Sequence, residues 1–230
     1  MGIVYRAARD DGQFEQQVAI KLLPNAAPSA DELRRFERER QILANLNHPH
    51  IARLYDGGVA EDGRLYLVME LVEGVPLTEF VDGKNLDQEA RIALFLQACA
   101  AVEHAHRRGV IHRDLKPSNV MVTMHDDKPV VKVIDFGVAK AISQRLTERT
   151  LFTELGQWIG TPEYMPPEQV RAWKVDARSD IYAIGIILYE SITLKRLFLG
   201  RTDLETLVNI RDASVPVRTR NIADCVRLRH

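Results

Sequence analysis

The sequence is organised around one short stretch, which reads His112-Arg113-Asp114-Leu115-Lys116-Pro117-Ser118-Asn119. Within eight residues it combines an acid, two cations and an amide. Pro117 excludes an ordinary helix, and the stretch lies between a helical pattern that ends at Gly109 and an apolar run over 120–122. The pattern therefore predicts a loop that is held at both ends. Loops of this kind often carry catalytic residues.

A second polar motif follows the first at close range. Asp135-Phe136-Gly137 begins sixteen residues after Asn119 and ends the apolar run 130–134. We expect the two motifs to face one site from adjacent strands. Together they resemble the catalytic loop and the metal-binding loop of eukaryotic-type protein kinases. The stretches 11–17 and 146–154 are similar in texture to the bacterial branch of that family.

The resemblance implies a role in phosphoryl transfer for four of these residues. Asp114 would orient the acceptor hydroxyl and take its proton, and Lys116 would neutralise charge on the moving phosphoryl group. Asn119 and Asp135 would bind Mg²⁺, with Mn²⁺ as an alternative, because hard cations prefer oxygen ligands. Lysine two residues after the aspartate is typical of the serine/threonine kinases, so the expected acceptors are Ser and Thr hydroxyls of proteins.

The first part of the chain predicts a strand hairpin followed by a helix. Residues 2–7 and 17–23 are predicted as antiparallel strands, and residues 65–70 as a further strand. Ser29 and Glu32 have the spacing of a capping box, and apolar residues then recur at helical intervals, which predicts a helix over 29–46.

One carboxylate of that helix is expected to point inward. Glu39 lies three residues after Phe36 and four before Leu43, which places it on the apolar stripe. An inward carboxylate needs a cation, and we predict Lys21 as its partner. The resemblance implies the same pair, in which Lys21 also binds the α- and β-phosphates of ATP. A partly exposed position at the rim is the alternative for Glu39.

The resemblance also implies contacts between ATP and further residues. Gly2 matches the third glycine of a glycine-rich loop whose first two glycines are absent, so we expect the family domain to be incomplete at its start. Val4 and Ala19 would press on adenine, and Met69 would be the gatekeeper. The remaining contacts would come from the backbone of Glu70 and Val72 and from the side chain of Met121.

The expected fold is α+β, with the two lobes of a protein kinase. The small lobe would cover 1–69, the hinge 70–74 and the mainly helical lobe 75–230. A long amphipathic helix is predicted over 88–108, and a second apolar helix begins at Asp180, whose carboxylate would brace the catalytic loop. We expect the resemblance to fade beyond residue 195, and the chain to end after Leu199 in a basic polar tail without the last family helices.

The stretch 143–150 is polar and is expected to belong to an activation segment. Arg113, next to Asp114, implies a cationic pocket that a phosphorylated segment would fill. Thr161 would link Asp114 to Lys116. The predicted phosphorylation sites are Thr150 and Thr153, followed by Thr147, and each has the alternative of a solvated loop threonine.

Composition limits the other classes of function. The chain has 31 basic and 32 acidic residues, so neither nucleic acid nor a membrane surface is expected as a main partner. The longest apolar run, residues 181–189, is about half of the roughly 20 residues that span a bilayer. With only Cys99 and Cys225, a reducing cytoplasm is the expected compartment, and an anchor outside these residues stays open.

The sequence leaves two other functions open. A pseudokinase-like binding module is the first, because the chain is expected to be truncated. A small-molecule phosphotransferase of the aminoglycoside type is the second, because it shares the Asp and Asn spacing. As partners, the kinase prediction implies ATP, protein substrates and self-association for autophosphorylation.

Overall fold

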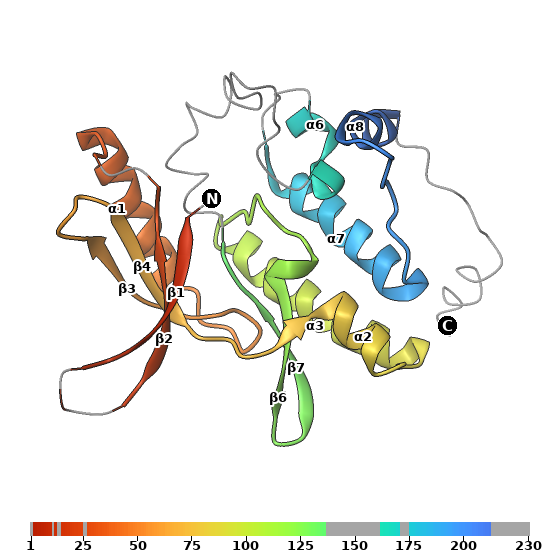
Figure 1. The fold of residues 1–230 in the computed structure, drawn as a ribbon, viewed down its shortest axis with the longest axis horizontal. Helices are drawn as coiled ribbons and strands as arrows, with labels where there is room; N and C mark the ends of the chain where they lie inside the picture. The colour runs from red at the N-terminus through yellow and green to blue at the C-terminus, as the bar shows by residue number, and fades with distance from the viewer. Residues whose placement is uncertain are drawn as a thin grey trace.

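The computed structural model describes residues 2–10, 12, 15–24, 27–136, 162–170 and 175–212, and it consists of two lobes (Figure 1). The smaller lobe is a β-sheet with one helix, and the larger lobe is mainly helical with a small second sheet. The predicted α+β, bilobal architecture is therefore confirmed.

The smaller lobe contains an antiparallel sheet with the order β1-β2-β4-β3. Its strands are β1 (Ile3–Ala8), β2 (Gln17–Leu22), β3 (Leu54–Val59) and β4 (Leu65–Glu70). The predicted hairpin and the predicted strand over 65–70 are confirmed, with hairpin ends that differ by one residue. Strand β3 was not predicted, because Gly57 and Gly58 interrupt its apolar pattern.

Helix α1 (Ala30–Ala44) packs beside β3 and begins with the predicted capping box. The Ser29 hydroxyl accepts a hydrogen bond from the N–H of Glu32 at 3.3 Å, and the Glu32 carboxylate accepts one from the N–H of Ser29 at 2.8 Å. These two bonds satisfy backbone donors that the first turn of a helix leaves unpaired. Helix α1 ends two residues before the predicted position.

The larger lobe is built around two long helices. Within the described residues, its helices are α2 (Leu77–Gly83), α3 (Gln88–Arg107), α6 (Pro167–Val170), α7 (Ala177–Thr193) and α8 (Asp203–Asp212). Helix α3 contacts both α7 and the second sheet, and its Ala98, Ala101 and Ala105 are fully buried. The guanidinium of Arg91 in α3 donates to the carbonyls of Ser191 and Ile192 at 3.2 and 3.1 Å, which caps the end of α7.

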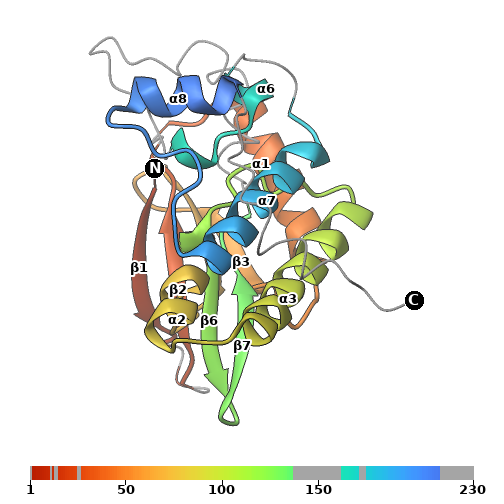
Figure 2. The same ribbon diagram turned by 90° about the vertical axis from the view of Figure 1, so that its right-hand side faces the viewer.

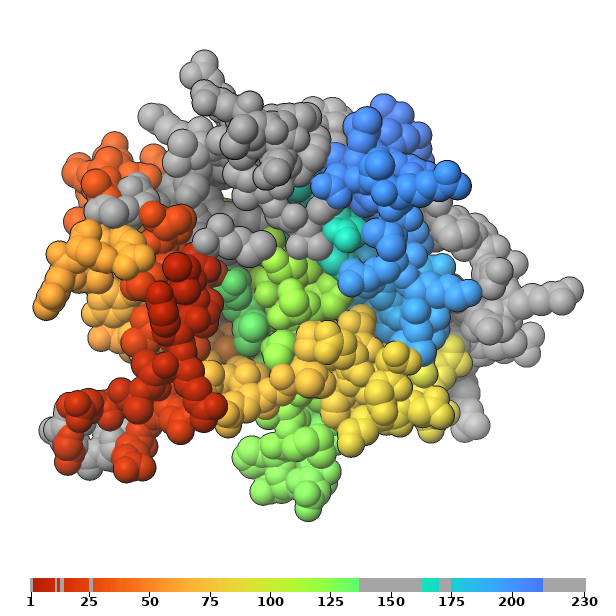
Figure 3. Space-filling view, in the orientation of Figure 1, coloured from red at the N-terminus to blue at the C-terminus, as the bar shows by residue number. Residues whose placement is uncertain are grey.

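The second sheet lies between the smaller lobe and the long helices (Figure 1). It contains β5 (Val75–Pro76), β6 (Val120–His125) and β7 (Lys128–Val133) in the order β5-β6-β7. The β6–β7 hairpin extends beyond the rest of the molecule at the lower edge of the view in Figure 3. Its two central residues, Asp126 and Asp127, both have positive φ, as tight hairpin turns require.

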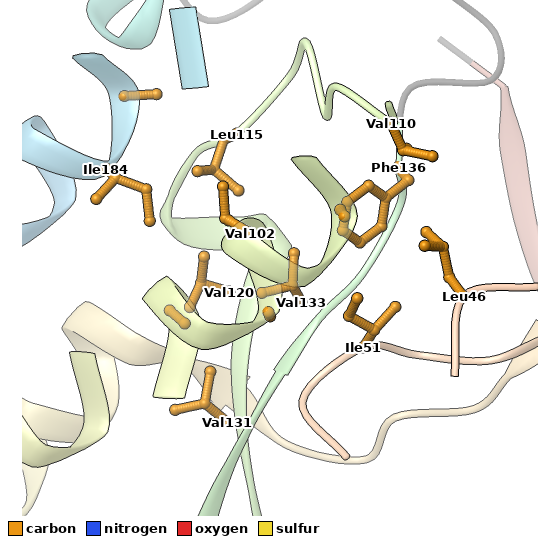
Figure 4. Close-up of a cluster of buried hydrophobic side chains, with 14 of the residues drawn as sticks. Leu46, Ile51, Val102, Val110, Leu115, Val120, Val131, Val133, Phe136 and Ile184 are labelled. Atoms are coloured by element: carbon orange, nitrogen blue, oxygen red, sulfur yellow. The ribbon is translucent and has the colours of Figure 1, made fainter. Parts of the chain in front are cut away.

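Backbone hydrogen bonds join the loop after α1 to this second sheet. The N–H of Val133 donates to the carbonyl of His50 at 2.8 Å, and the N–H of Ala52 donates to the carbonyl of Val133 at 2.9 Å. Ile51, between them, is buried. Figure 4 shows its side chain near Val133 and Phe136, so one apolar cluster contains residues from both lobes.

Helix α8 lies beside α6 at one end of the larger lobe (Figure 2). Its Ile210 packs with Tyr164, Ile186 and Phe198 in a second apolar cluster. The expected polar tail after Leu199 is therefore wrong for residues 203–212, where Leu207 and Ile210 supply a buried helical face. In the part of the chain that the structure describes, no helix combines the length and the apolar character needed to cross a bilayer.

Candidate active site

The stretch 112–119 forms a loop between α3 and β6, as its sequence predicts. Pro117–Asn119 makes a short 3₁₀ turn at its end, and the N–H of Asn119 donates to the carbonyl of Lys116 at 2.9 Å. The N–H of Ile134 donates to the carbonyl of Asn119 at 2.9 Å, which joins the loop to the segment before Asp135. The two polar motifs therefore lie side by side. Figure 3 shows atoms of this green region at the surface, between the red-and-orange lobe and blue α7.

The carboxylate of Asp180, in helix α7, is hydrogen-bonded to the start of this loop. It accepts hydrogen bonds from the backbone N–H of His112 at 2.7 Å and of Arg113 at 2.9 Å. The predicted bracing role of Asp180 is thus confirmed. Arg113 has a φ of +65°, a strained value for a residue with a side chain, and the two hydrogen bonds help to hold it there.

A third partner of Asp180 was not predicted. The Nε2 of His106, in the last turn of α3, lies 2.7 Å from Oδ2 of Asp180, the oxygen that also accepts from the N–H of His112. Asp180 is only 1% exposed, and burial alone would raise the pKa of its carboxyl group. The hydrogen bond from His106, the nearby His112 and the two backbone donors outweigh burial, so the pKa of Asp180 lies below its ordinary value.

His112 links the loop to the Asp135 segment. Its Nε2 lies 2.9 Å from the carbonyl of Ile134, which can only accept, so this nitrogen carries the proton. Its Nδ1 then accepts from the N–H of Asp114 at 3.4 Å, and its ring lies 4.6 Å from that of Phe136, between centroids. Burial lowers the pKa of His112, which keeps the imidazole neutral in this arrangement.

Two predicted catalytic residues, Asp114 and Lys116, and the predicted metal ligand Asn119 lie together on the loop. The Lys116 ammonium is 3.3 Å from the Asp114 carboxylate, and both side chains are partly buried. The side-chain amide of Asn119 donates to the backbone carbonyl of Asp114 at 2.8 Å. That bond uses the nitrogen of the amide, so its oxygen is the atom left for a cation.

Lys21 reaches the same site from the smaller lobe. Its ammonium forms an ion pair with the carboxylate of Asp135, which follows β7. The structure differs here from the predicted pairing of Lys21 with Glu39. Glu39 is half-buried, and its carboxylate has no hydrogen bond or ion pair with another described residue. Two carboxylates compete for one ammonium, and in this structure Asp135 holds it.

Strand register places the predicted adenine contacts on one face of the first sheet. Val4 is opposite Lys21, and Ala19 is opposite Met69. Opposed residues of antiparallel strands share a face, and so do residues two apart, so all four side chains point to the same side. Ala19 is buried, whereas Val4 is 57% exposed at the rim. Gly2 lies against Leu22, and a Cβ there would be 2.2 Å from the Leu22 carbonyl oxygen.

The predicted hinge connects β4 to β5. The N–H of Glu70 donates to the carbonyl of Arg53 at 2.8 Å, whereas no backbone hydrogen bond to another described residue engages Val72. Val72 therefore has the donor that the predicted contact with adenine requires. Gly74 passes so close to β6 that a Cβ would lie 2.2 Å from the Val122 carbonyl oxygen. Met121 is opposite Pro76 in the second sheet, next to the end of the hinge.

The residues fit a magnesium ion in number and type. Mg²⁺ is usually held by one or two carboxylates together with substrate phosphates and water. Asp135 supplies a carboxylate, and Asn119 supplies an amide oxygen, because the nitrogen of that amide is already hydrogen-bonded to Asp114. The hydrogen bond between Ile134 and Asn119 keeps the two residues side by side. In the described ranges, no group of three or more His, Cys, Asp and Glu side chains could form a cage made of protein ligands alone. A site completed by a nucleotide agrees with both observations.

The predicted regulatory threonines cannot be placed. Thr147, Thr150, Thr153 and Thr161 lie outside the described residues. Glu168 in α6 accepts a hydrogen bond from the Ser179 hydroxyl at the start of α7.

Two contributors to this region were missed. The sequence places His106 only within the helix predicted over 88–108, and Lys132 only within the apolar run 130–134. In the structure, the ammonium of Lys132 lies 2.7 Å from the Glu70 carboxylate. Val131 and Val133 are buried on the core side of β7. The alternation Val-Lys-Val could have placed Lys132 on the opposite face, but it could not have named its partner.

Comparison with known proteins agrees with this geometry. The family model described as protein kinase domain matches residues 1–226. The expectation that the resemblance fades beyond residue 195 is therefore wrong. The chain is 39% identical over 218 residues to serine/threonine-protein kinase PknB of Mycobacterium leprae, covering 92% of this chain and 34% of that protein.

Two further relatives come from other bacteria. The chain is 41% identical over 196 residues to serine/threonine-protein kinase pkn3 of Myxococcus xanthus, covering 84% of this chain and 35% of that protein. It is 39% identical over 205 residues to the probable serine/threonine-protein kinase SCO3848 of Streptomyces coelicolor, covering 87% and 29%. The chain spans about a third of the length of these relatives. It belongs to the protein kinase family, and its relatives are bacterial serine/threonine kinases.

Proposed function

We propose that this chain transfers the γ-phosphoryl group of ATP to serine and threonine hydroxyls of proteins. The main observation in support is that three parts of the chain meet in one site: the loop 112–119, the segment with Asp135, and strand β2 with Lys21. The loop with Asp114, Lys116 and Asn119 is fixed by Asp180, and Lys21 of the other lobe reaches Asp135 beside that loop.

The chemical group and the position of each site residue indicate its role in phosphoryl transfer. Asp114 accepts a proton from the substrate hydroxyl, and Lys116, 3.3 Å away, neutralises charge on the transferred group. Lys21 binds the α- and β-phosphates of ATP, in exchange for its ion pair with Asp135. Glu39 holds Lys21 once the lysine leaves Asp135. The hinge and the face with Val4, Ala19 and Met69 bind adenine.

Asn119 and Asp135 would hold the metal ion through their side-chain oxygens. Mg²⁺ held there would supply positive charge that neutralises the phosphates during transfer. The backbone around both ligands is fixed by the hydrogen bond between Ile134 and Asn119. This fixed geometry positions the reacting groups, which is the main requirement of phosphoryl transfer.

Phosphorylation of the activation segment is proposed as the regulatory step, with Thr150 and Thr153 as the first sites and Thr147 as the next. Arg113 would bind the phosphate. Self-association would bring one chain to the segment of another for autophosphorylation. Mapping phosphates on the active protein tests this, and an active protein without phosphate between residues 138 and 160 contradicts it.

The test of the function is a transfer assay with purified protein, labelled ATP, Mg²⁺ and a basic test protein. We expect label on serine and threonine by phosphoamino-acid analysis, and its loss in Asp114→Asn. Asp126→Asn is the matched control, because Asp126 lies in the exposed turn between β6 and β7. Nucleotide binding without transfer would instead favour a binding module, and transfer only to small molecules would favour the second alternative.

A further inference from the structure

An ion pair joins the hinge to the second sheet, behind the face expected to hold adenine. The Lys132 ammonium lies 2.7 Å from one carboxylate oxygen of Glu70 and 3.1 Å from the other. The two side chains are 17% and 23% exposed, so the pair is largely shielded from solvent. Such pairs are screened less by salt than exposed ones.

The carboxylate of Glu70 has one more donor. The N–H of Arg53 donates to it at 3.1 Å, while the N–H of Glu70 donates back to the Arg53 carbonyl at 2.8 Å. The backbone of Arg53 therefore holds Glu70 through both its backbone N–H and its side-chain carboxylate. Because Glu70 is the last residue of β4, this fixes where the hinge begins.

Lys132 comes from the strand that leads to the metal-binding motif. It lies opposite Met121 in the β6–β7 ladder, so both side chains are on the same face of the second sheet. Met121 is the expected floor of the adenine pocket. Lys132 therefore connects the strand beneath adenine with the hinge beside it. Asp135 follows Lys132 by three residues along the same chain segment.

We propose that Lys132 is a positioning residue for ATP, which acts through Glu70 by holding the hinge in the shape that binds adenine. This inference rests on the proposed kinase function. A hinge ordered before binding loses less conformational entropy when adenine arrives. Without Lys132, the shielded carboxylate of Glu70 would turn toward water, and the hinge would have to be ordered again at each binding event.

The test compares Lys132→Met and Glu70→Gln with the unaltered chain. Methionine keeps the length of the lysine stem, and glutamine keeps an acceptor for the N–H of Arg53. We expect the KM for ATP and the Kd for a fluorescent ATP analogue to rise by about threefold to tenfold, the range of a partly buried ion pair, with kcat within about twofold. Lys132→Arg should retain the unaltered values.

The double variant with Glu70→Lys and Lys132→Glu separates the ion pair from the individual residues. Reversal of both charges keeps the attraction, so we expect it to recover most of the ATP affinity that either single reversal loses. The matched control is Asp62→Asn, which removes a 2.6 Å ion pair with Arg64 in the same lobe, away from the hinge. This control should leave KM and kcat unchanged.

Hydrogen exchange provides a readout that does not depend on catalysis. In Lys132→Met, amides of residues 71–74 should exchange faster, while those of α7 keep their rates. If the unaltered chain transfers no phosphate, the kinase function fails, and this comparison still shows whether the pair orders the hinge. Unchanged exchange at the hinge, an unchanged KM for ATP, or a change in kcat as large as that in KM would each overturn the inference.

Discussion

The carboxylate of Asp180 accepts a 2.7 Å hydrogen bond from the backbone N–H of His112, across 68 residues of sequence. A buried carboxylate of helix α7 thus holds the loop that contains Asp114. The same carboxylate binds the N–H of Arg113 and the ring of His106, so three groups depend on one side chain.

Replacement of Asp180 by asparagine should therefore affect both stability and activity. An amide has only one acceptor oxygen, which leaves one of the buried donors unpaired. We expect a loss of about 2–4 kcal/mol in the free energy of unfolding and a marked fall in kcat. Urea unfolding and transfer kinetics measure these changes. Asp82→Asn, on the exposed side of α2, is the control, and an equal loss there would contradict the argument.

Replacement of Lys21 by methionine should remove activity while leaving the fold intact. Lys21 is the cation that pairs with Asp135 and, in the proposed function, binds the phosphates of ATP. We expect phosphoryl transfer to fall by at least about 100-fold, as for other losses of charge stabilisation at a reacting group. Lys128→Met, in an exposed position at the start of β7, should have no such effect. Retention of more than a tenth of the activity would exclude the role of Lys21.

The stability of the fold should depend on pH through the ionisation of Glu190 in α7. Its carboxyl group is 4% exposed, and burial raises its pKa to about 7 from an ordinary value of 4.5. Between these pH values the folded protein keeps a proton that the unfolded chain releases, so this group makes stability fall as pH rises from about 4.5 to 7. Above pH 7 the ionised carboxylate destabilises the fold.

Glu190→Gln should remove this dependence. Glutamine keeps an acceptor for the hydroxyl of Tyr164, which lies 2.8 Å from Glu190. We expect the variant to be more stable by about 2 kcal/mol at pH 8 and equal to the unaltered chain at pH 4. This gain in stability is smaller than the free energy that corresponds to the whole pKa shift, because Arg196 lies 3.8 Å from the carboxylate and its positive charge partly stabilises the ionised form. Thermal unfolding across this pH range measures it, and a variant less stable at pH 8 would show that Arg196 dominates.

Two glycines should respond to alanine with opposite signs. At Gly74 a Cβ would lie 2.2 Å from the carbonyl oxygen of Val122, so Gly74→Ala must displace the hinge from β6. We expect a loss of about 2 kcal/mol in unfolding free energy and a higher KM for ATP. At Gly83, in helix α2, a Cβ meets no atom within 4 Å, and alanine should stabilise the fold by about 0.5–1 kcal/mol. Equal effects at both positions would contradict this account.

Much of the fold was predictable because local patterns specify local structure. The capping box at Ser29, the short apolar run of β4 and the apolar spacing in α3 each indicate one element, and all three are found. Strand β3 and helix α8 were missed where glycines or charged residues dilute the apolar pattern. These elements form because neighbouring elements cover their apolar faces, which a local pattern does not show.

The sequence by itself determined the chemistry of the site: an acid, a lysine and an amide on a loop that contains Pro117, followed by an aspartate after a strand. Only the tertiary structure decided which charges meet. Lys21 pairs with Asp135 rather than Glu39, and Lys132 with Glu70, because an ion pair depends on distances between residues that are far apart in the chain. Apolar periodicity determines which face of an element is buried, whereas the packing of the two lobes determines which charge lies opposite.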